Sequence, residues 1–124
     1  MAKRVLVVED DVLNSMFICA TLESRGFAVK AVTDGAQVLS AVRAFDPDLV
    51  TMDINLPNVS GVKLIEKLKA EPKLKQIPVI ATPVFVGRGE ETRIRGGGAA
   101  IYLAKPISIK PFMASVERLL EEGS

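Results

Sequence analysis

The chain of 124 residues contains no histidine. Histidine is the commonest general base, a frequent metal ligand and the side chain that carries the phosphoryl group in kinases and phosphotransferases. Any chemistry performed by this chain must therefore depend on carboxylates, lysine or hydroxyl groups.

Cysteine and long apolar runs are also scarce. The single cysteine, Cys19, has no second cysteine with which to form an internal disulfide. Apolar residues make up 48% of the sequence, but they occur in runs of about five, whereas a membrane span needs about 20. The N-terminus enters an apolar run within four residues, without a cleavable leader. We expect a soluble protein of the reducing cytoplasm.

Neither sign of charge is in clear excess. The 16 basic and 15 acidic residues nearly cancel, so no long-range field favours nucleic acid or an anionic membrane as the partner. The length suits one compact domain. We therefore expect residues 1–124 to form a single domain, without room for a second, effector domain, and to bind other proteins as a monomer or weak dimer.

Short apolar runs alternate with segments of helical period along the whole chain. The apolar runs predict five strands: Arg4–Val8, Phe27–Val32, Leu49–Asp53, Pro78–Thr82 and Ala100–Ala104. Helices are expected to begin near Asp11, Asp34, Ser60, Arg88 and Ser108; Asp34 and Ser60 are suitable capping residues. Five strand–helix units thus fill the chain.

The apolar spacing also indicates which helix faces are buried. The first helix repeats Leu13, Met16, Phe17 and Ala20 at three- and four-residue intervals, and the last aligns Phe112, Met113, Val116, Leu119 and Leu120. The fourth segment, Arg88–Arg95, is polar and is followed by three glycines, Gly96–Gly98, which should end it. We expect this helix to be weakly held.

This alternation predicts a parallel sheet. Parallel strands need crossover connections, those connections are right-handed, and helices then cover both faces. The fold class is therefore α/β, a three-layer αβα sandwich around a five-stranded parallel sheet. In such folds ligands bind beyond the carboxyl ends of the strands.

Acidic residues follow two of the predicted strands. Glu9, Asp10 and Asp11 end the first, and Asp53 ends the third. Carboxylates gathered at one sheet edge repel one another, and Mg²⁺, which prefers hard oxygen ligands, would offset that repulsion. For Asp11, capping of the following helix is an equally good explanation. Asp53 ends an apolar run and does not begin a helix.

Lys105, after the fifth strand, would complete this site. An ammonium group there can neutralise an oxyanion attached to a neighbouring carboxylate. The sequence therefore predicts one site that combines an acid cluster, a nucleophilic aspartate and a lysine.

Three segments, VLVVEDD, DLVTMDINLPNVSG and IYLAKPI, resemble the signature segments of the CheY-like receiver family. The resemblance covers the whole chain and implies a flavodoxin-like sheet of strand order 2-1-3-4-5. It also implies these roles: phosphoryl acceptor, Asp53; Mg²⁺ ligands, Glu9, Asp10, Asp53 and the carbonyl of Asn55; essential lysine, Lys105; cis proline, Pro106; and rotating switch aromatic, Tyr102.

The sequence departs from the family pattern at one position. Receivers normally carry Thr or Ser at the end of the fourth strand, where the hydroxyl bonds the phosphoryl group, but this chain has Pro83. Thr82 lies one residue earlier, and consecutive strand residues face opposite sides of a sheet. Either the switch contact is lost, or Pro83 bends the chain and turns Thr82 toward the site.

The resemblance implies a single-domain response regulator. It would accept a phosphoryl group from a histidine kinase or histidine phosphotransferase, and it would signal through the face formed by the fourth helix, fifth strand and fifth helix, including Ile94 and Tyr102. It would be a signalling protein and not an enzyme. A pseudo-receiver adaptor that binds partners without phosphorylation is the alternative that Pro83 suggests. A nucleotide- or flavin-binding protein is disfavoured, because the first turn is Glu9–Asp10–Asp11 and has no glycine-rich phosphate cradle.

Overall fold

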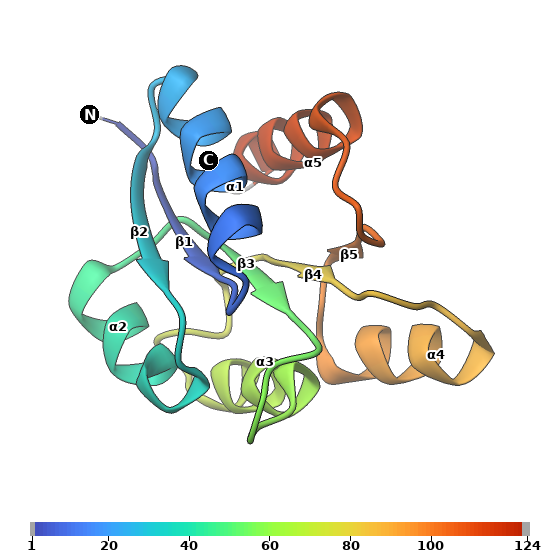
Figure 1. The fold of residues 1–124 in the computed structure, drawn as a ribbon. Coiled ribbons are helices and arrows are strands. Elements are labelled where there is room, and N and C mark those ends of the chain that lie inside the picture. Colours follow the sequence, from blue (N-terminus) through green and yellow to red (C-terminus); the bar gives the residue numbers. More distant parts are fainter. Residues whose placement is uncertain (1, 123–124) are drawn as a thin grey trace.

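The computed structural model describes residues 2–122, which form a parallel five-stranded sheet flanked by helices (Figure 1). The strand order is β2-β1-β3-β4-β5, as predicted. The strands are β1 (Arg4–Val8), β2 (Ala28–Val32), β3 (Leu49–Asp53), β4 (Val79–Thr82) and β5 (Ile101–Tyr102). The helices are α1 (Val12–Ser24), the short 3₁₀ helix η1 (Gly35–Gln37), α2 (Val38–Phe45), α3 (Gly61–Ala70), α4 (Arg88–Gly97) and α5 (Ile109–Glu122).

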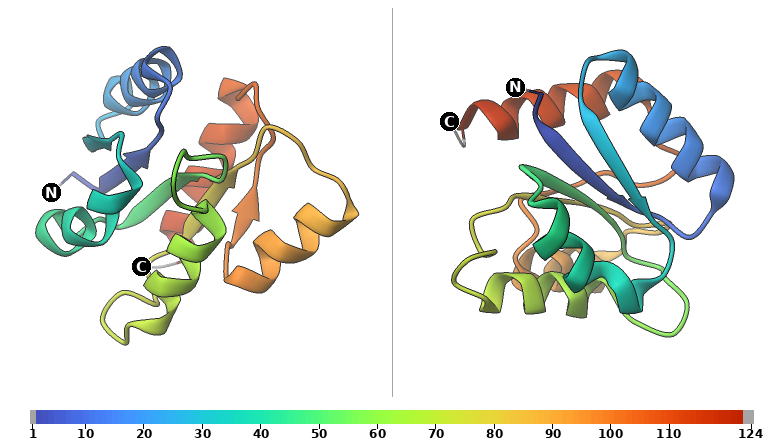
Figure 2. Two further views of the ribbon diagram at one scale, coloured as in Figure 1. Left: turned by 60° about the horizontal axis from the view of Figure 1, so that its bottom comes forward. Right: turned by 90° about the vertical axis from the view of Figure 1, so that its left-hand side faces the viewer.

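Two hydrophobic cores separate the three layers. Helices α1 and α5 cover one face of the sheet, and α2, α3 and α4 cover the other (Figures 1 and 2). The α1/α5 side buries Ile18 and Phe112 against residues of β1 and β4, and the opposite side buries Val42 and Ile65. Alternate residues of β1 belong to different cores, which confirms the predicted αβα sandwich. None of the helices described here is long and apolar enough to cross a membrane.

Two of the predicted helix starts are capped by aspartate. The Asp11 carboxylate accepts the Asn14 N–H at 2.9 Å at the start of α1, and Asp34 accepts the Ala36 N–H at 2.9 Å at the start of η1. Ser60 occupies the cap position of α3 without a capping hydrogen bond from its side chain. Asp11 therefore has a structural role that accounts for its position after β1.

The predicted buried face of α1 is wrong. The structure buries Ser15, Ile18 and Leu22, whereas Leu13 is 77% exposed, Met16 62% and Phe17 42%, and Ala20 is exposed as well. Helix α1 is apolar around most of its circumference, so hydrophobic spacing alone could not show which side faces the sheet. An apolar stripe consequently faces outward on this helix.

The end of α4 and the extent of β5 also differ from the sequence prediction. Helix α4 continues through Gly96 and ends at Gly97, and it is followed by the C-cap residue Gly98, whose φ of +111° suits glycine. A Cβ at Gly97 would lie 3.1 Å from Val62 of α3, so this glycine lets the two helices pack closely. Strand β5 spans Ile101–Tyr102, whereas the sequence predicted Ala100–Ala104.

A close approach of two backbones places the start of α3 next to the end of β3. The Gly61 N–H donates to the carbonyl of Ile54 at 3.2 Å. A Cβ at Gly61 would lie 2.4 Å from the carbonyl oxygen of Asp53 and 2.7 Å from the Cα of Ile54. Because both contacts are with backbone atoms, they cannot be relieved by a change of rotamer.

We predict that Gly61→Ala lowers the free energy of unfolding by about 1–3 kcal/mol, because the added methyl group must push α3 away from β3. Gly96→Ala is the matched control: nothing lies within 4 Å of its added Cβ, so it should stabilise α4 by up to about 1 kcal/mol. Urea unfolding of both variants measures the difference. Equal stability of the Gly61 variant and the wild type would contradict the close approach.

Candidate functional site

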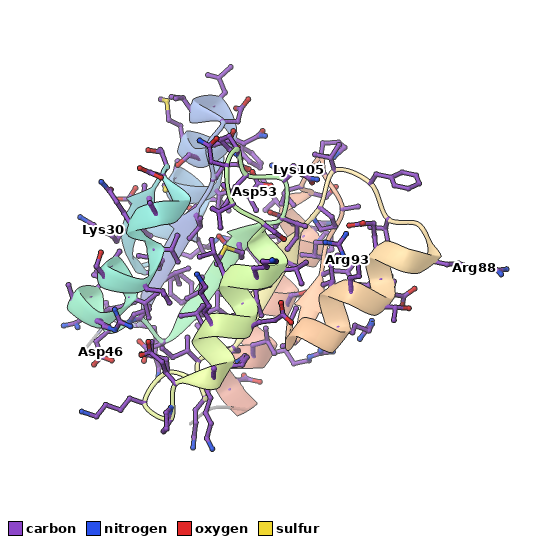
Figure 3. The ribbon with its side chains drawn as sticks, turned by 90° about the horizontal axis from the view of Figure 1, so that it is seen from below. Lys30, Asp46, Asp53, Arg88, Arg93 and Lys105 are labelled. Atoms are coloured by element: carbon purple, nitrogen blue, oxygen red, sulfur yellow. The ribbon has the colours of Figure 1, made fainter. Side chains whose placement is uncertain are left out.

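The predicted site residues meet at the carboxyl edge of the sheet. Glu9 and Asp10 follow β1, Asp53 ends β3, and Lys105 follows β5. Figure 3 shows the Asp53 and Lys105 side chains close together. Parallel pairing aligns β1, β3 and β4 in register, with Val8 beside Met52 and Asp53 beside Thr82. This alignment brings residues that are distant in sequence to one edge.

Lys105 lies between two buried carboxylates. Its Nζ is 2.7 Å from Glu9 Oε1 and 3.3 Å from Asp53 Oδ1. Glu9 and Asp53 are each only 1% exposed. The ammonium group therefore compensates two charges that are almost entirely removed from water, and such burial is tolerated only where charges are paired.

The local electrostatics shift two pKa values. Burial raises the pKa of Asp53, and the adjacent Glu9 carboxylate raises it further, against the opposing effects of Asp10 and of the Asn55 N–H. Burial by itself lowers the pKa of Lys105, but the Glu9 and Asp53 carboxylates outweigh it and raise that pKa. The lysine thus stays protonated beside the acids.

The acid cluster suits a divalent cation. Carboxylate oxygens of Glu9, Asp10 and Asp53 can lie within 4.8 Å of one another. These three carboxylates exceed the single Lys105 ammonium by two negative charges when all are ionised, which is the charge that a divalent ion cancels. Hard carboxylate oxygens are also the donors that Mg²⁺ prefers. The residues present therefore fit the predicted metal.

Asn55 links the site to the connection between β4 and α4. Its backbone N–H donates to Asp53 Oδ1 at 3.0 Å, and its side-chain Oδ1 accepts the N–H of Val84 at 2.9 Å. The resemblance assigned Asn55 only a metal-binding carbonyl, so sequence reasoning missed its side chain. No sequence signal identifies this contact, because Val84 is 29 residues away.

The hydroxyl of Thr82 does not take the place that Pro83 leaves empty. Thr82 is buried, and its Oγ1 donates to the carbonyl of Met52 at 3.4 Å. No hydrogen bond joins Thr82 to Asp53 among the contacts of the described residues. Pro83 follows the last residue of β4 and also lacks a hydroxyl. These contacts favour the lost-switch interpretation over a displaced hydroxyl.

The other residues predicted for the switch and for the output face have mixed outcomes. The Lys105–Pro106 peptide bond is cis, as expected. The guanidinium of Arg95 lies over the Tyr102 ring, 5.2 Å from its centroid, and Tyr102 is partly buried against the core. Ile94, however, is 0% exposed and belongs to the α2/α3/α4 core. Its predicted place on an accessible face is therefore wrong.

We predict that Lys105→Met lowers the free energy of unfolding by about 3–5 kcal/mol at about pH 7, because it leaves two buried carboxylates without their cation. The loss should shrink as the pH falls. A buried carboxyl with a raised folded-state pKa binds protons more readily when folded, so acid favours the folded variant.

Lys110→Met, at an exposed position of α5, is the control and should change stability by less than about 0.5 kcal/mol. Adding Glu9→Gln to the Lys105 variant should restore part of the lost stability, since it removes one uncompensated charge. Chemical unfolding at several pH values measures both effects. A pH-independent loss would show that the lysine acts through packing alone.

The sequence matches the family described as the response regulator receiver domain over residues 5–117. Proteins named polar-differentiation response regulator DivK, from Brucella ovis and Brucella anthropi, are each 39% identical over 123 residues, covering 99% of this chain and all of the relative.

Solved structures agree with this match. A CheY-like receiver domain protein from Methanospirillum hungatei superposes with a TM-score of 0.92 at 23% identity, covering 99% of this chain and 97% of that one, and shows the same fold. The receiver domain of sensor histidine kinase PA1611 from Pseudomonas aeruginosa has a TM-score of 0.89 at 27% identity, with coverage of 98% and 99%. That structure is described with a magnesium ion in the active-site cleft. Together with the acid cluster and lysine at the sheet edge, these matches establish that the chain belongs to the response regulator receiver domain family.

Proposed function

We propose that this protein is a single-domain response regulator that accepts a phosphoryl group on Asp53 and signals through contacts with other proteins. The observation that carries the proposal is the meeting of Asp53 with the Lys105 ammonium group and with the Glu9 and Asp10 carboxylates at one edge of the sheet. This arrangement supplies an anionic nucleophile, a cation beside it and oxygen ligands for a metal.

The proposed donor is a phosphohistidine of a kinase or phosphotransferase, since the chain itself has no histidine. An Asp53 carboxylate oxygen forms the new bond to phosphorus as the phosphorus–nitrogen bond breaks, and the bonding electrons return to the partner's imidazole. Lys105 offsets negative charge on the acceptor. Mg²⁺, held by Glu9, Asp10, Asp53 and the carbonyl of Asn55, would neutralise further charge on the phosphoryl oxygens.

The molecular surface around Asp53 suits a protein donor. The exposed large apolar side chains among the described residues are Val12, Leu13, Met16, Phe17, Val84, Phe85 and Ile109. All of them lie in the first half of α1, in the β4–α4 connection or at the start of α5, and these segments leave the sheet at the edge that carries Asp53. Exposed apolar patches mark protein contacts. The outward stripe of α1 therefore supports docking of an apolar partner surface beside the acceptor.

For the output we propose the face formed by α4, β5 and α5, with Tyr102 and Arg95 at its centre. The Arg95 guanidinium covers the Tyr102 ring and lies 3.4 Å from Glu91. Aromatic and arginine side chains are enriched at protein interfaces. A protein partner fits this surface better than nucleic acid, because the charges of the chain nearly cancel.

One observation favours a second candidate, an adaptor that binds partners without phosphorylation-dependent switching. Position 83 is proline, and Thr82 bonds to Met52 and not to Asp53. The intact acid cluster and lysine argue for the first candidate. Detection of an Asp53 adduct that changes partner affinity separates the two.

We predict that a small-molecule phosphodonor with Mg²⁺ phosphorylates the wild type and not Asp53→Asn, because the amide is similar in shape but is not an anionic nucleophile. Intact-mass spectrometry measures the added phosphoryl group. Asp48→Asn, a change at an acid remote from the site, is the control and should leave phosphorylation intact. Modification of the Asp53 variant would place the acceptor elsewhere.

We also predict that Asp10→Asn weakens Mg²⁺ binding by at least about tenfold, because it removes a charged ligand. Asp11→Asn is a close control, since it removes the same charge one residue away while keeping a capping side chain on Asn14. Isothermal titration should show that Asp11→Asn changes the Mg²⁺ affinity by less than about threefold, because solvent screens the charge at this exposed position. Equal losses in the two variants would indicate a field effect and contradict ligation by Asp10.

A further inference from the structure

The peptide group between Pro83 and Val84 is held from both sides. Its carbonyl oxygen accepts the backbone N–H of Lys105 at 2.8 Å. Its N–H donates to the side-chain Oδ1 of Asn55 at 2.9 Å. Both polar atoms of one peptide are therefore fixed, directly after the last residue of β4.

The two residues that hold this peptide also contact Asp53. The Asn55 N–H lies 3.0 Å from Asp53 Oδ1, and the Lys105 Nζ lies 3.3 Å from the same oxygen. A change of charge or bonding at Asp53 Oδ1 therefore acts on two residues at once. Both of them also contact the same peptide group, Asn55 through its side chain and Lys105 through its backbone N–H.

Neither Pro83 nor Thr82 connects the end of β4 to Asp53 through a side-chain hydrogen bond in the described part of the chain. Pro83 has neither a hydroxyl nor an N–H, and the Thr82 hydroxyl bonds to Met52. Asn55 and Lys105 both contact Asp53, and both also bond to the Pro83–Val84 peptide. Within the described residues, these two hydrogen bonds connect the segment after β4 to the partners of Asp53.

The held peptide leads into an exposed segment that reaches α4. Val84 is 60% exposed and Phe85 is 72% exposed. A Cβ at Gly87, the residue before α4, would lie 3.1 Å from the Phe85 ring. A shift of the Pro83–Val84 peptide would therefore move an apolar side chain that packs against the start of α4.

We propose that Asn55 is a positioning residue whose carboxamide couples the state of Asp53 to the β4–α4 connection, in place of the hydroxyl that position 83 lacks. This inference rests on the proposed phosphoryl-accepting function. Of the two hydrogen bonds to the Pro83–Val84 peptide, only the one made by Asn55 can be removed by mutation, because Asn55 uses its side chain whereas Lys105 uses its backbone N–H. An exposed, single hydrogen bond also forms and breaks readily, as a coupling contact must.

The first experiment tests the contact in the absence of metal and phosphodonor. Asn55→Ala should accelerate hydrogen exchange of the Val84 amide by about 3- to 10-fold, the loss expected for one hydrogen bond. Asn55→Asp keeps an acceptor oxygen and should retain protection. Ser60→Ala is the control, because Ser60 lies with Asn55 in the connection between β3 and α3 and its side chain makes no capping hydrogen bond. It should leave the exchange rate of the Val84 amide unchanged. Unchanged exchange in Asn55→Ala would overturn the proposal.

The second experiment tests the coupling. The chain has no tryptophan, so Phe85→Trp is a single fluorescent reporter in the β4–α4 connection. Beryllium fluoride with Mg²⁺, a phosphoryl mimic, should change its emission. Asn55→Ala keeps the backbone carbonyl assigned to Mg²⁺ and the N–H that contacts Asp53, and at concentrations where ¹⁹F NMR shows equal adduct occupancy it should remove most of that emission change. An equal emission change with and without Asn55→Ala would overturn the coupling. Absence of the adduct in the reporter protein would instead contradict the proposed function, and the Val84 exchange rate would still decide whether Asn55 holds the peptide.

Discussion

The ion pairs of Lys105 constrain much of this structure. A single ammonium group serves two carboxylates that are each 1% exposed, so the ends of β1 and β3 and the segment after β5 must meet within a few ångströms. The parallel register satisfies that requirement, and the absence of a side chain at Gly61 leaves room for α3 beside it. The stability of the fold and the proposed phosphoryl transfer would therefore depend on the same charges.

The sequence predicted those parts in which a chemical boundary is sharp. Strands β1 and β3 have the predicted ends, because a carboxylate interrupts each apolar run, Glu9 directly after β1 and Asp53 as the last residue of β3. The acid cluster and Lys105 followed from the rule that parallel strands end at one edge. Prediction failed for α1, where apolar residues occur on several sides and Leu13 is exposed, and for Ile94, whose burial depends on how α4 packs.

Contacts across long sequence separations were also beyond prediction. The Asn55 side chain finds the Val84 N–H only because β3 and β4 are neighbours and end at the same level. The sequence showed that position 83 lacks a hydroxyl. The hydrogen-bond partner of Thr82, the carbonyl of Met52, could be identified only from the folded backbone. Local patterns specify which groups are available, whereas the tertiary structure decides which of them meet.

The two ends of α4 are anchored very differently. Ile94 is fully buried, and Gly97 packs so closely on Val62 that a side chain would crowd it. At the other end Arg88 points away from the protein (Figure 3), and nothing lies within 4 Å of a Cβ at Gly89. Helix α4 is therefore held mainly at its C-terminal end. A small displacement at Gly87 would therefore tilt the helix, with little disturbance of the core at Ile94.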